Sequence, residues 1–218
     1  KKIVLMRHGL PLEQFPFLPR PPSAVPRILA AGRFVAKKGF ETLLAAAGDA
    51  GLRDRDFRLV LLGEGPLEKK LRAQIKRHDL GAKVTLHAPA SGETLRAFFR
   101  QSDVFLAPYE TADDGDSDGV PNTILEAFAL GLPVVGTAAG SMGELLSPQT
   151  GTRVAEKNPA ALAEAIAAYL DDARPHVAKT QAARAVIERE YDLAKNVEPL
   201  VDLFSVQHLG RTNCDGNN

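Results

Sequence analysis

Hydrophobic residues along the chain occur in short, wholly apolar runs that alternate with longer amphipathic stretches. Such runs, ending at Gly, Pro or polar residues, are typical of strands buried on both faces. The stretches between them place apolar residues three or four positions apart, as helices that cover a sheet do. The predicted strands are 27–32, 57–63, 83–88, 103–108, 132–137 and 151–155. The predicted helices are 37–50, 65–80, 91–101, 121–130, 141–146 and 158–172, with two more helical stretches to about Phe204.

This alternation predicts the fold class. Strand and helix alternate at least five times, with roughly 20–30 residues in each unit. Apolar strands joined by crossover helices form parallel sheets that are covered on both faces. We therefore predict an α/β fold, a doubly wound, Rossmann-like parallel sheet, over residues 27–204.

The two ends of the chain depart from the regular pattern. Residues 2–7 are a strand candidate, and "HGLPLEQFPFLPRPPSAVP" after them contains six prolines, which exclude a regular helix or strand. We interpret 1–26 as a strand and a proline-rich linker. Residues 205–218 are rich in polar residues, and we expect a disordered tail.

Composition narrows the class of protein. The 218 residues include 44% hydrophobic ones, enough for a sizeable core. Lys+Arg and Asp+Glu both number 27, which argues against nucleic-acid binding through a strongly basic surface. The one cysteine, Cys214, allows no intrachain disulfide and fits a reducing, cytoplasmic location. We find no apolar run of transmembrane length and no signal peptide, and the missing initiator Met suggests a fragment of a longer protein.

Loops that follow the strands carry the candidate chemistry, because ligands bind at the carboxyl ends of parallel strands. Arg33 and Lys38 follow the first regular strand, and two cations there can hold a diphosphate, although a solvated basic turn is the commoner case. "GEGPLE" offers free amides at a helix start but lacks a full phosphate-binding motif, so an ordinary tight turn is favoured. His87 ends the third strand, where a histidine is usually structural, although its backbone could meet a flat base.

The stretch "DGDSDGVPNTILEAFALG", residues 114–131, joins an acidic loop to an apolar helix and allows two hypotheses. Its opening matches a calcium loop, D-x-D-x-D-G. That loop needs Glu at position twelve, where this chain has Leu125, with Glu126 one residue late. Pro121 also lies within the would-be loop.

The second hypothesis places a nucleotide sugar at the helix start. Unpaired amides of the first helical turn suit an anionic diphosphate. Glu126, one turn further, could accept two ribose hydroxyls, and Asp118 could hold the hydroxyls of the other sugar. The alternative is that Asp118 is a turn residue and Glu126 a solvent-facing one. A charge between Leu125 and Phe128 on an apolar helix favours a partner or ligand.

Most of residues 1–204 resemble the C-terminal domain of the GT-B glycosyltransferases of family 4, a large retaining family. "DGVPNTILE" stands in the place of the family's E-x7-E motif, and "RHGLPLEQF" resembles its interdomain strand and turn. The resemblance continues through "ILAAGRFVAKKGFETLLAA", "LVLLGEGPLEKKL", "DVFLAPY" and "EAFALGLPVVGTAAGSMGELL". Two departures concern the donor sugar: the first motif acid is Asp118 where Glu is commoner, and Ser141 replaces a frequent Gly.

The resemblance implies a hexosyltransferase domain that binds a UDP-, GDP- or ADP-sugar. The ribose would contact Glu126, the transferred sugar Asp118 and Gly119, and the base the backbone near His87. The residues implied for the donor diphosphate are Arg33, Lys38, Val120, Pro121 and Asn122.

It implies neither a cofactor nor a metal site at "DGD". The acceptor and the catalytic His would belong to a missing N-terminal domain. The chain alone would then transfer little or no sugar, and membrane association through the missing half stays open. Two alternatives remain: a sugar-nucleotide epimerase or phosphorylase of the same architecture, and a non-enzymatic calcium- or nucleotide-binding module.

Overall fold

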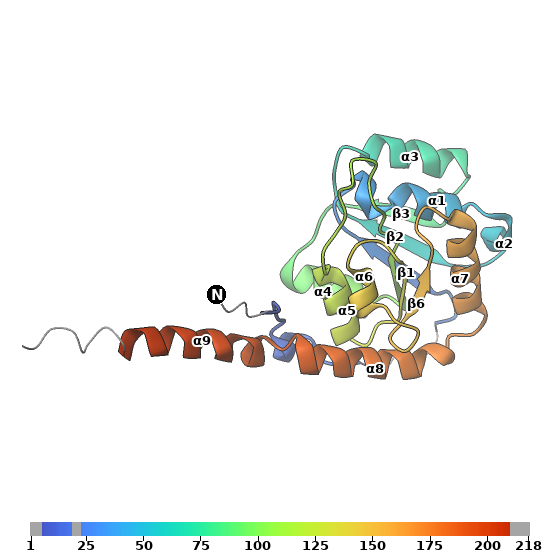
Figure 1. Ribbon diagram of the computed structural model, residues 1–218. Coiled ribbons are helices and arrows are strands. Elements are labelled where there is room, and N and C mark those ends of the chain that lie inside the picture. Colours follow the sequence, from blue (N-terminus) through green and yellow to red (C-terminus); the bar gives the residue numbers. More distant parts are fainter. Residues whose placement is uncertain (1–5, 19–22, 210–218) are drawn as a thin grey trace, which may run out of the picture.

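Six parallel strands form one sheet in the computed structural model of the chain, which describes residues 6–18 and 23–209 (Figure 1). Their order is β3-β2-β1-β4-β5-β6, so the chain builds outward from β1 in one direction and then in the other. The predicted doubly wound α/β fold is confirmed. The strands are β1 (Arg27–Ala31), β2 (Arg58–Leu62), β3 (Val84–His87), β4 (Val104–Ala107), β5 (Val134–Thr137) and β6 (Thr152–Val154).

Helices cover both faces of this sheet. One face carries α1 (Phe40–Ala47), α2 (Ala50–Arg53), α3 (Glu68–Arg77) and α7 (Pro159–Asp171). The other carries α4 (Gly92–Arg100), α5 (Asn122–Ala129), α6 (Met142–Leu145) and α8 (Pro175–Glu190). The remaining elements are the 3-10 turns η1 (Leu12–Gln14) and η2 (Ala36–Lys38) and the last helix, α9 (Leu193–Leu209).

The core lies in two layers, one on each face of the sheet. Successive strand residues point to opposite faces. Ile28 and Ala30 of β1 therefore join one buried cluster, whereas Leu29 and Ala31 join the other. Because both faces are buried, the strands need apolar residues throughout, which is the pattern in the sequence.

The predicted helix over 37–50 is broken at Gly39. This residue has a φ of +63°, and a Cβ there would collide with the carbonyl oxygen of Pro108. The chain therefore forms η2 before Gly39 and α1 after it, and α2 follows as a separate turn. The collision involves Pro108, which is distant in the sequence, so the local pattern alone did not reveal the break.

Both ends of the chain differ from the predicted picture. Residues 2–5 of the N-terminal strand candidate lie outside the described residues, and Met6 and Arg7 are not in a strand. The predicted linker holds one short 3-10 turn, η1. Helix α9 continues to Leu209, so residues 205–209 are helical and not the start of an irregular tail. The rest of the predicted tail lies outside the described residues.

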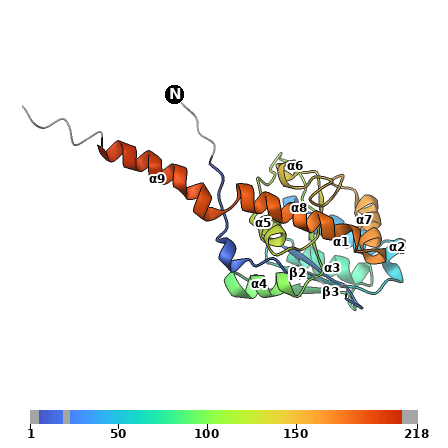
Figure 2. The same ribbon diagram turned by 90° about the horizontal axis from the view of Figure 1, so that it is seen from below.

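Helix α9 projects from the body of the domain (Figures 1 and 2). It carries exposed apolar side chains at Leu193, Val197, Val201 and Phe204, a spacing of three or four residues. No helix within residues 6–18 and 23–209 is both long and apolar enough to cross a membrane.

Candidate functional site

A cavity of about 300 Å³ opens at the carboxyl end of β1, beside the start of α5. The loop after β1 and the end of the acidic loop line it from opposite sides. The predicted diphosphate and sugar residues thus lie together, although their roles stay predictions. The lining residues are Ala31, Gly32, Arg33, Lys38, Asp118, Gly119, Val120, Pro121, Asn122 and Thr123.

Lys38 is held between an acid and an aromatic ring inside this cavity. Its Nζ lies 2.6 Å from Asp118 Oδ2 and 4.3 Å from the ring centroid of Tyr109, a cation–π arrangement. The Tyr109 hydroxyl shares a 2.9 Å hydrogen bond with Thr123 Oγ1, and burial raises the pKa of Tyr109. The predicted diphosphate cation and the predicted sugar acid are therefore in direct contact before any donor binds.

A second lysine, which the sequence analysis did not single out, reaches the same acid. Lys37 Nζ lies 2.9 Å from the Asp116 carboxylate and 3.5 Å from Asp118 Oδ1. The hydrogen bond to Asp116, with the nearby charge of Asp118, raises the pKa of the Lys37 ammonium. The signal available in the sequence was a pair of adjacent lysines in one loop and a cluster of acids in another.

The acids of the "DGDSDG" loop are thus balanced by lysine side chains. Asp114 Oδ1 accepts a hydrogen bond from the backbone N–H of Asp116, while Lys37 contacts Asp116 and Asp118. Among residues 6–18 and 23–209, no group of three or more His, Cys, Asp and Glu side chains could hold a metal ion. The geometry gives the calcium hypothesis no support, and the absence of a metal site stays a prediction.

The loop before α6 supports the backbone of Asp118. Gly140 has a φ of +53°, and a Cβ there would collide with the carbonyl oxygen of Asp118. The N–H of Ser141 donates to the same oxygen at 3.3 Å. Because Ser141 contributes a backbone group, the departure at this position from the frequent Gly leaves the contact intact.

Glu126 lies on the second turn of α5, outside the residues that line the cavity. Its side chain is largely buried, and Oε2 has no hydrogen-bond partner in the described part of the chain. Burial raises the pKa of this carboxyl to about 7, against a smaller lowering by Arg96. A buried carboxyl oxygen without a partner can accept a hydrogen bond from a ligand hydroxyl.

His87 lies at the end of β3 and is not among the cavity residues. Its exposed ring packs edge-on against Phe98, with 5.4 Å between centroids. Its carbonyl oxygen accepts a hydrogen bond from Gly63 N–H. The structure therefore does not bring His87 together with the other predicted residues.

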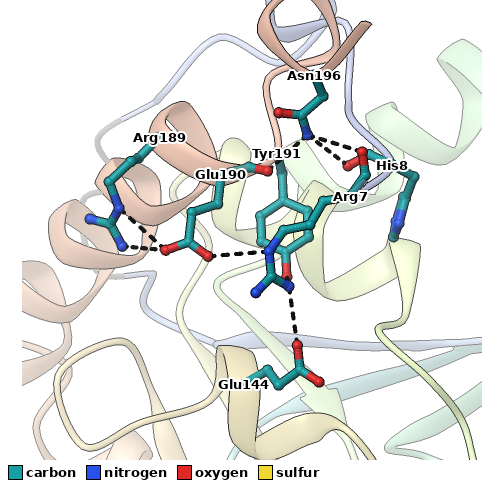
Figure 3. Close-up of polar contacts among 7 residues, drawn as sticks. All are labelled: Arg7, His8, Glu144, Arg189, Glu190, Tyr191 and Asn196. Carbon is teal, nitrogen blue, oxygen red and sulfur yellow. Dashed lines mark hydrogen bonds and ion pairs between the residues drawn. The ribbon is translucent and has the colours of Figure 1, made fainter. Parts of the chain in front are cut away.

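The segment predicted to connect two domains lies against the junction of α8 and α9 (Figure 3). An Arg7 guanidinium N–H donates to Glu144 Oε2 and to the Tyr191 hydroxyl, both at 3.1 Å. Arg7 Nε also lies 3.6 Å from Glu190 Oε2. Glu144 is on α6, so Arg7 connects the entering segment with the helix that follows the Gly140 loop.

Asn196 ties the first turn of α9 to the same segment (Figure 3). Its side-chain N–H groups donate to the carbonyl oxygens of Arg7 and His8 at 3.2 Å and of Glu190 at 2.8 Å. Backbone bonds between Leu10 and residues Tyr191 and Leu193 complete the contact. The chain thus enters the domain and begins its last helix at one shared, hydrogen-bonded point.

Residues 25–172 match the protein family described as Glycosyl transferases group 1. The match covers well over half of the chain. The chain belongs to this family. In Escherichia coli, a putative colanic acid biosynthesis glycosyltransferase, WcaL, is 32% identical over 200 residues, which are 88% of this chain and 48% of WcaL. The chain spans about half the length of the curated relatives that it matches.

Solved structures of glycosyltransferases share the fold of this family member. The C-terminal domain of LpcC, a glycosyl transferase group 1 protein from Francisella tularensis, matches with a TM-score of 0.71 and 19% identity. That match covers 85% of this chain and 100% of the LpcC domain. Alr3699/HepE from Anabaena, in complex with UDP and glucose, matches with a TM-score of 0.77 and 18% identity over 92% of this chain and 56% of its own. The Rossmann-like sheet is thus that of GT-B glycosyltransferases.

Proposed function

We propose that this chain is the C-terminal, donor-binding domain of a retaining family 4 glycosyltransferase. The complete enzyme would transfer a hexose from a nucleotide-diphosphate sugar to an acceptor bound mainly by its other half. The observation that carries the proposal is the cavity beside α5. There the loop with Arg33 and Lys38 faces Asp118 and the free amides of a helix start.

Most of the cavity residues have a role in this proposal. Arg33 and Lys38, with the α5 start at Val120, Pro121 and Asn122, bind the donor diphosphate. Asp118 and Gly119 contact the transferred sugar. Beyond the cavity, Glu126 accepts hydrogen bonds from the ribose, and the backbone near His87 contacts the base.

The transfer breaks the bond between the anomeric carbon and the β-phosphate oxygen and forms one to an acceptor oxygen. Negative charge develops on the departing phosphate, where Arg33, Lys38 and the positive end of α5 would stabilise it. These groups take the part of a divalent metal, so the proposal requires neither a metal nor a cofactor. The base or other catalytic group comes from the other half, and the chain alone transfers little or no sugar.

The comparisons support this proposal over the alternatives. The family match favours a transferase over a sugar-nucleotide epimerase or phosphorylase. HepE, which shares the fold, has been solved with UDP and glucose, and this is consistent with a nucleotide-sugar donor here. The LpcC domain, which this fold matches over its whole length, is a C-terminal one.

Calorimetric titration with UDP, GDP and ADP and their hexose conjugates, with and without divalent metal, tests the proposal. We expect saturable, metal-independent binding of one nucleotide, tighter for its sugar conjugate. Glu126→Ala should weaken nucleotide binding at least about tenfold, as expected for the loss of two hydrogen bonds. The melting temperature of this variant controls for folding. A variant that melts early but binds normally per folded molecule would make Glu126 structural.

Binding of no nucleotide by the full-length protein at millimolar ligand would contradict the proposal. Binding only in the presence of a divalent metal would contradict the assigned roles of Arg33 and Lys38.

A further inference from the structure

The pairing of Lys38 with Asp118 creates a conflict in the proposed donor site. Lys38 Nζ lies 2.6 Å from Asp118 Oδ2, and both side chains are mostly buried. In the proposed complex the same ammonium contacts the donor diphosphate, while Asp118 contacts the hexose. An ammonium that turns toward phosphate oxygens gives up part of its hold on the carboxylate, so Asp118 needs a second support.

Lys37 approaches the other oxygen of the same carboxylate. Its Nζ lies 3.5 Å from Asp118 Oδ1 and 2.9 Å from Asp116. The Lys37 side chain is 16% exposed and that of Asp118 17%, so solvent screens this pair less than an open surface pair. Lys37 does not line the cavity, whereas Lys38 and Asp118 do.

Lys37 and its closer partner, Asp116, are both anchored through their backbones. The Lys37 carbonyl accepts a hydrogen bond from Glu110 N–H at 2.9 Å, and Gly39, directly after the lysine pair, packs against Pro108. On the other side, the Asp116 carbonyl accepts a hydrogen bond from Ala112 N–H at 2.8 Å. Lys37 can therefore stay in place while Lys38 changes partner.

We propose that Lys37 is a positioning residue that fixes Asp118 Oδ1, so that Oδ2 faces the donor hexose when Lys38 engages the diphosphate. This inference rests on the proposed function and deepens it. Because Lys37 acts on the sugar-binding acid alone, it sets the preference for the sugar conjugate over the free nucleoside diphosphate. Lys38, in contrast, acts on both ligands.

The test uses the full-length protein and calorimetric titration with three pairs of ligands: UDP and UDP-glucose, GDP and GDP-mannose, and ADP and ADP-glucose. The measured quantity is the ratio of Kd for the free diphosphate to Kd for its conjugate. We expect Lys37→Met to lower this ratio about fivefold, as for the loss of a partly buried charged contact, with the Kd of the free diphosphate within about twofold of wild type. Lys37→Arg should restore most of the ratio.

Lys157→Met is the matched control. Lys157 forms an ion pair at 3.3 Å with Asp113 of the same acidic loop, but both side chains are far more exposed. Its removal changes the charge by the same amount and should leave the ratio unchanged.

The outcomes distinguish a failure of the proposed function from a failure of the role of Lys37. If the wild type binds no nucleotide, the proposed function fails and the role of Lys37 fails with it. If the wild type prefers a sugar conjugate and Lys37→Met keeps that preference, or weakens both ligands equally, the donor domain stands and Lys37 is not a positioning residue. A wild type that binds a diphosphate without any sugar preference also overturns the inference.

Discussion

At the scale of single residues, two carboxylates eight positions apart in the sequence occupy opposite electrostatic environments. Asp118 lies within ion-pair distance of two lysines, Lys37 and Lys38. Glu126 lies within an apolar helix, and its Oε2 has no hydrogen-bond partner in the described chain. Burial in the second environment raises the pKa of the Glu126 carboxyl to about 7.

Glu126 should make the stability of the protein depend on pH. Its pKa rises from 4.5 to about 7 in the folded state, so between these values the folded protein binds more protons than the unfolded chain. The free energy of unfolding therefore falls as the pH rises through that interval. Glu126→Gln should remove this dependence. The free energy of unfolding of the variant minus that of wild type should be larger at pH 8 than at pH 4, by up to about 3 kcal/mol.

Urea unfolding of both proteins at pH 4, 6 and 8 measures this difference. Asp118→Asn provides the comparison, because Asp118 is paired with lysines and its replacement should cost stability at pH 8. If the free energies of unfolding of wild type and Glu126→Gln change in parallel from pH 4 to pH 8, Glu126 is not the source of the pH dependence.

The sequence predicted features formed by neighbouring residues better than contacts between residues far apart in the chain. The helix start, Asp118 and Glu126 form one local motif, and its chemistry could be read from consecutive residues. The contacts of Lys37 and Lys38 with the acidic loop span about eighty residues, and only the strand order brings those loops together. The unpaired oxygen of Glu126 likewise depends on packing that no local pattern shows.

At the scale of elements, Gly39 is a position where the fold requires glycine. The regular alternation of strands and helices was predictable because the central strands β1, β2, β4 and β5 are largely buried. The break before α1 was not, because it results from close approach to Pro108 on a neighbouring strand's loop. The same break sets η2, and with it Lys37 and Lys38, at an angle to α1 that a continuous helix would not give.

Gly39→Ala should therefore be strongly destabilising. The left-handed φ alone costs about 1–2 kcal/mol for a residue with a Cβ. The collision with the Pro108 carbonyl adds to this, so we expect a loss of about 3 kcal/mol or more. Gly115→Ala is the control, since Gly115 also has a positive φ, +83°, but its Cβ would meet open space. Equal losses for the two variants in urea unfolding would show that the collision with Pro108 contributes nothing.

At the scale of the whole molecule, an apolar surface of α9 lies outside the two buried layers of the described chain. The two layers beside the sheet are closed by their helices, but α9 extends beyond them with Leu193, Val197 and Phe204 exposed (Figure 2). Exposed apolar faces of this kind mark contacts with other parts of a protein. The chain spans about half the length of the curated relatives that it matches.

We expect the remainder of the enzyme to cover this face of α9. The helix begins where Arg7 and Asn196 hold the N-terminal segment of the described chain. Replacing Val197 and Phe204 with Glu would place two charges in that contact, and a buried unpaired charge costs several kcal/mol. In the full-length enzyme the double variant should lower the rate of sugar transfer at least about tenfold. Nucleotide binding should persist, because Val197 and Phe204 do not line the cavity beside α5. The 218-residue chain should bind nucleotide equally well with or without the two substitutions, and it should transfer no sugar in either form. Full transfer activity of the double variant would mean that α9 faces solvent in the complete enzyme.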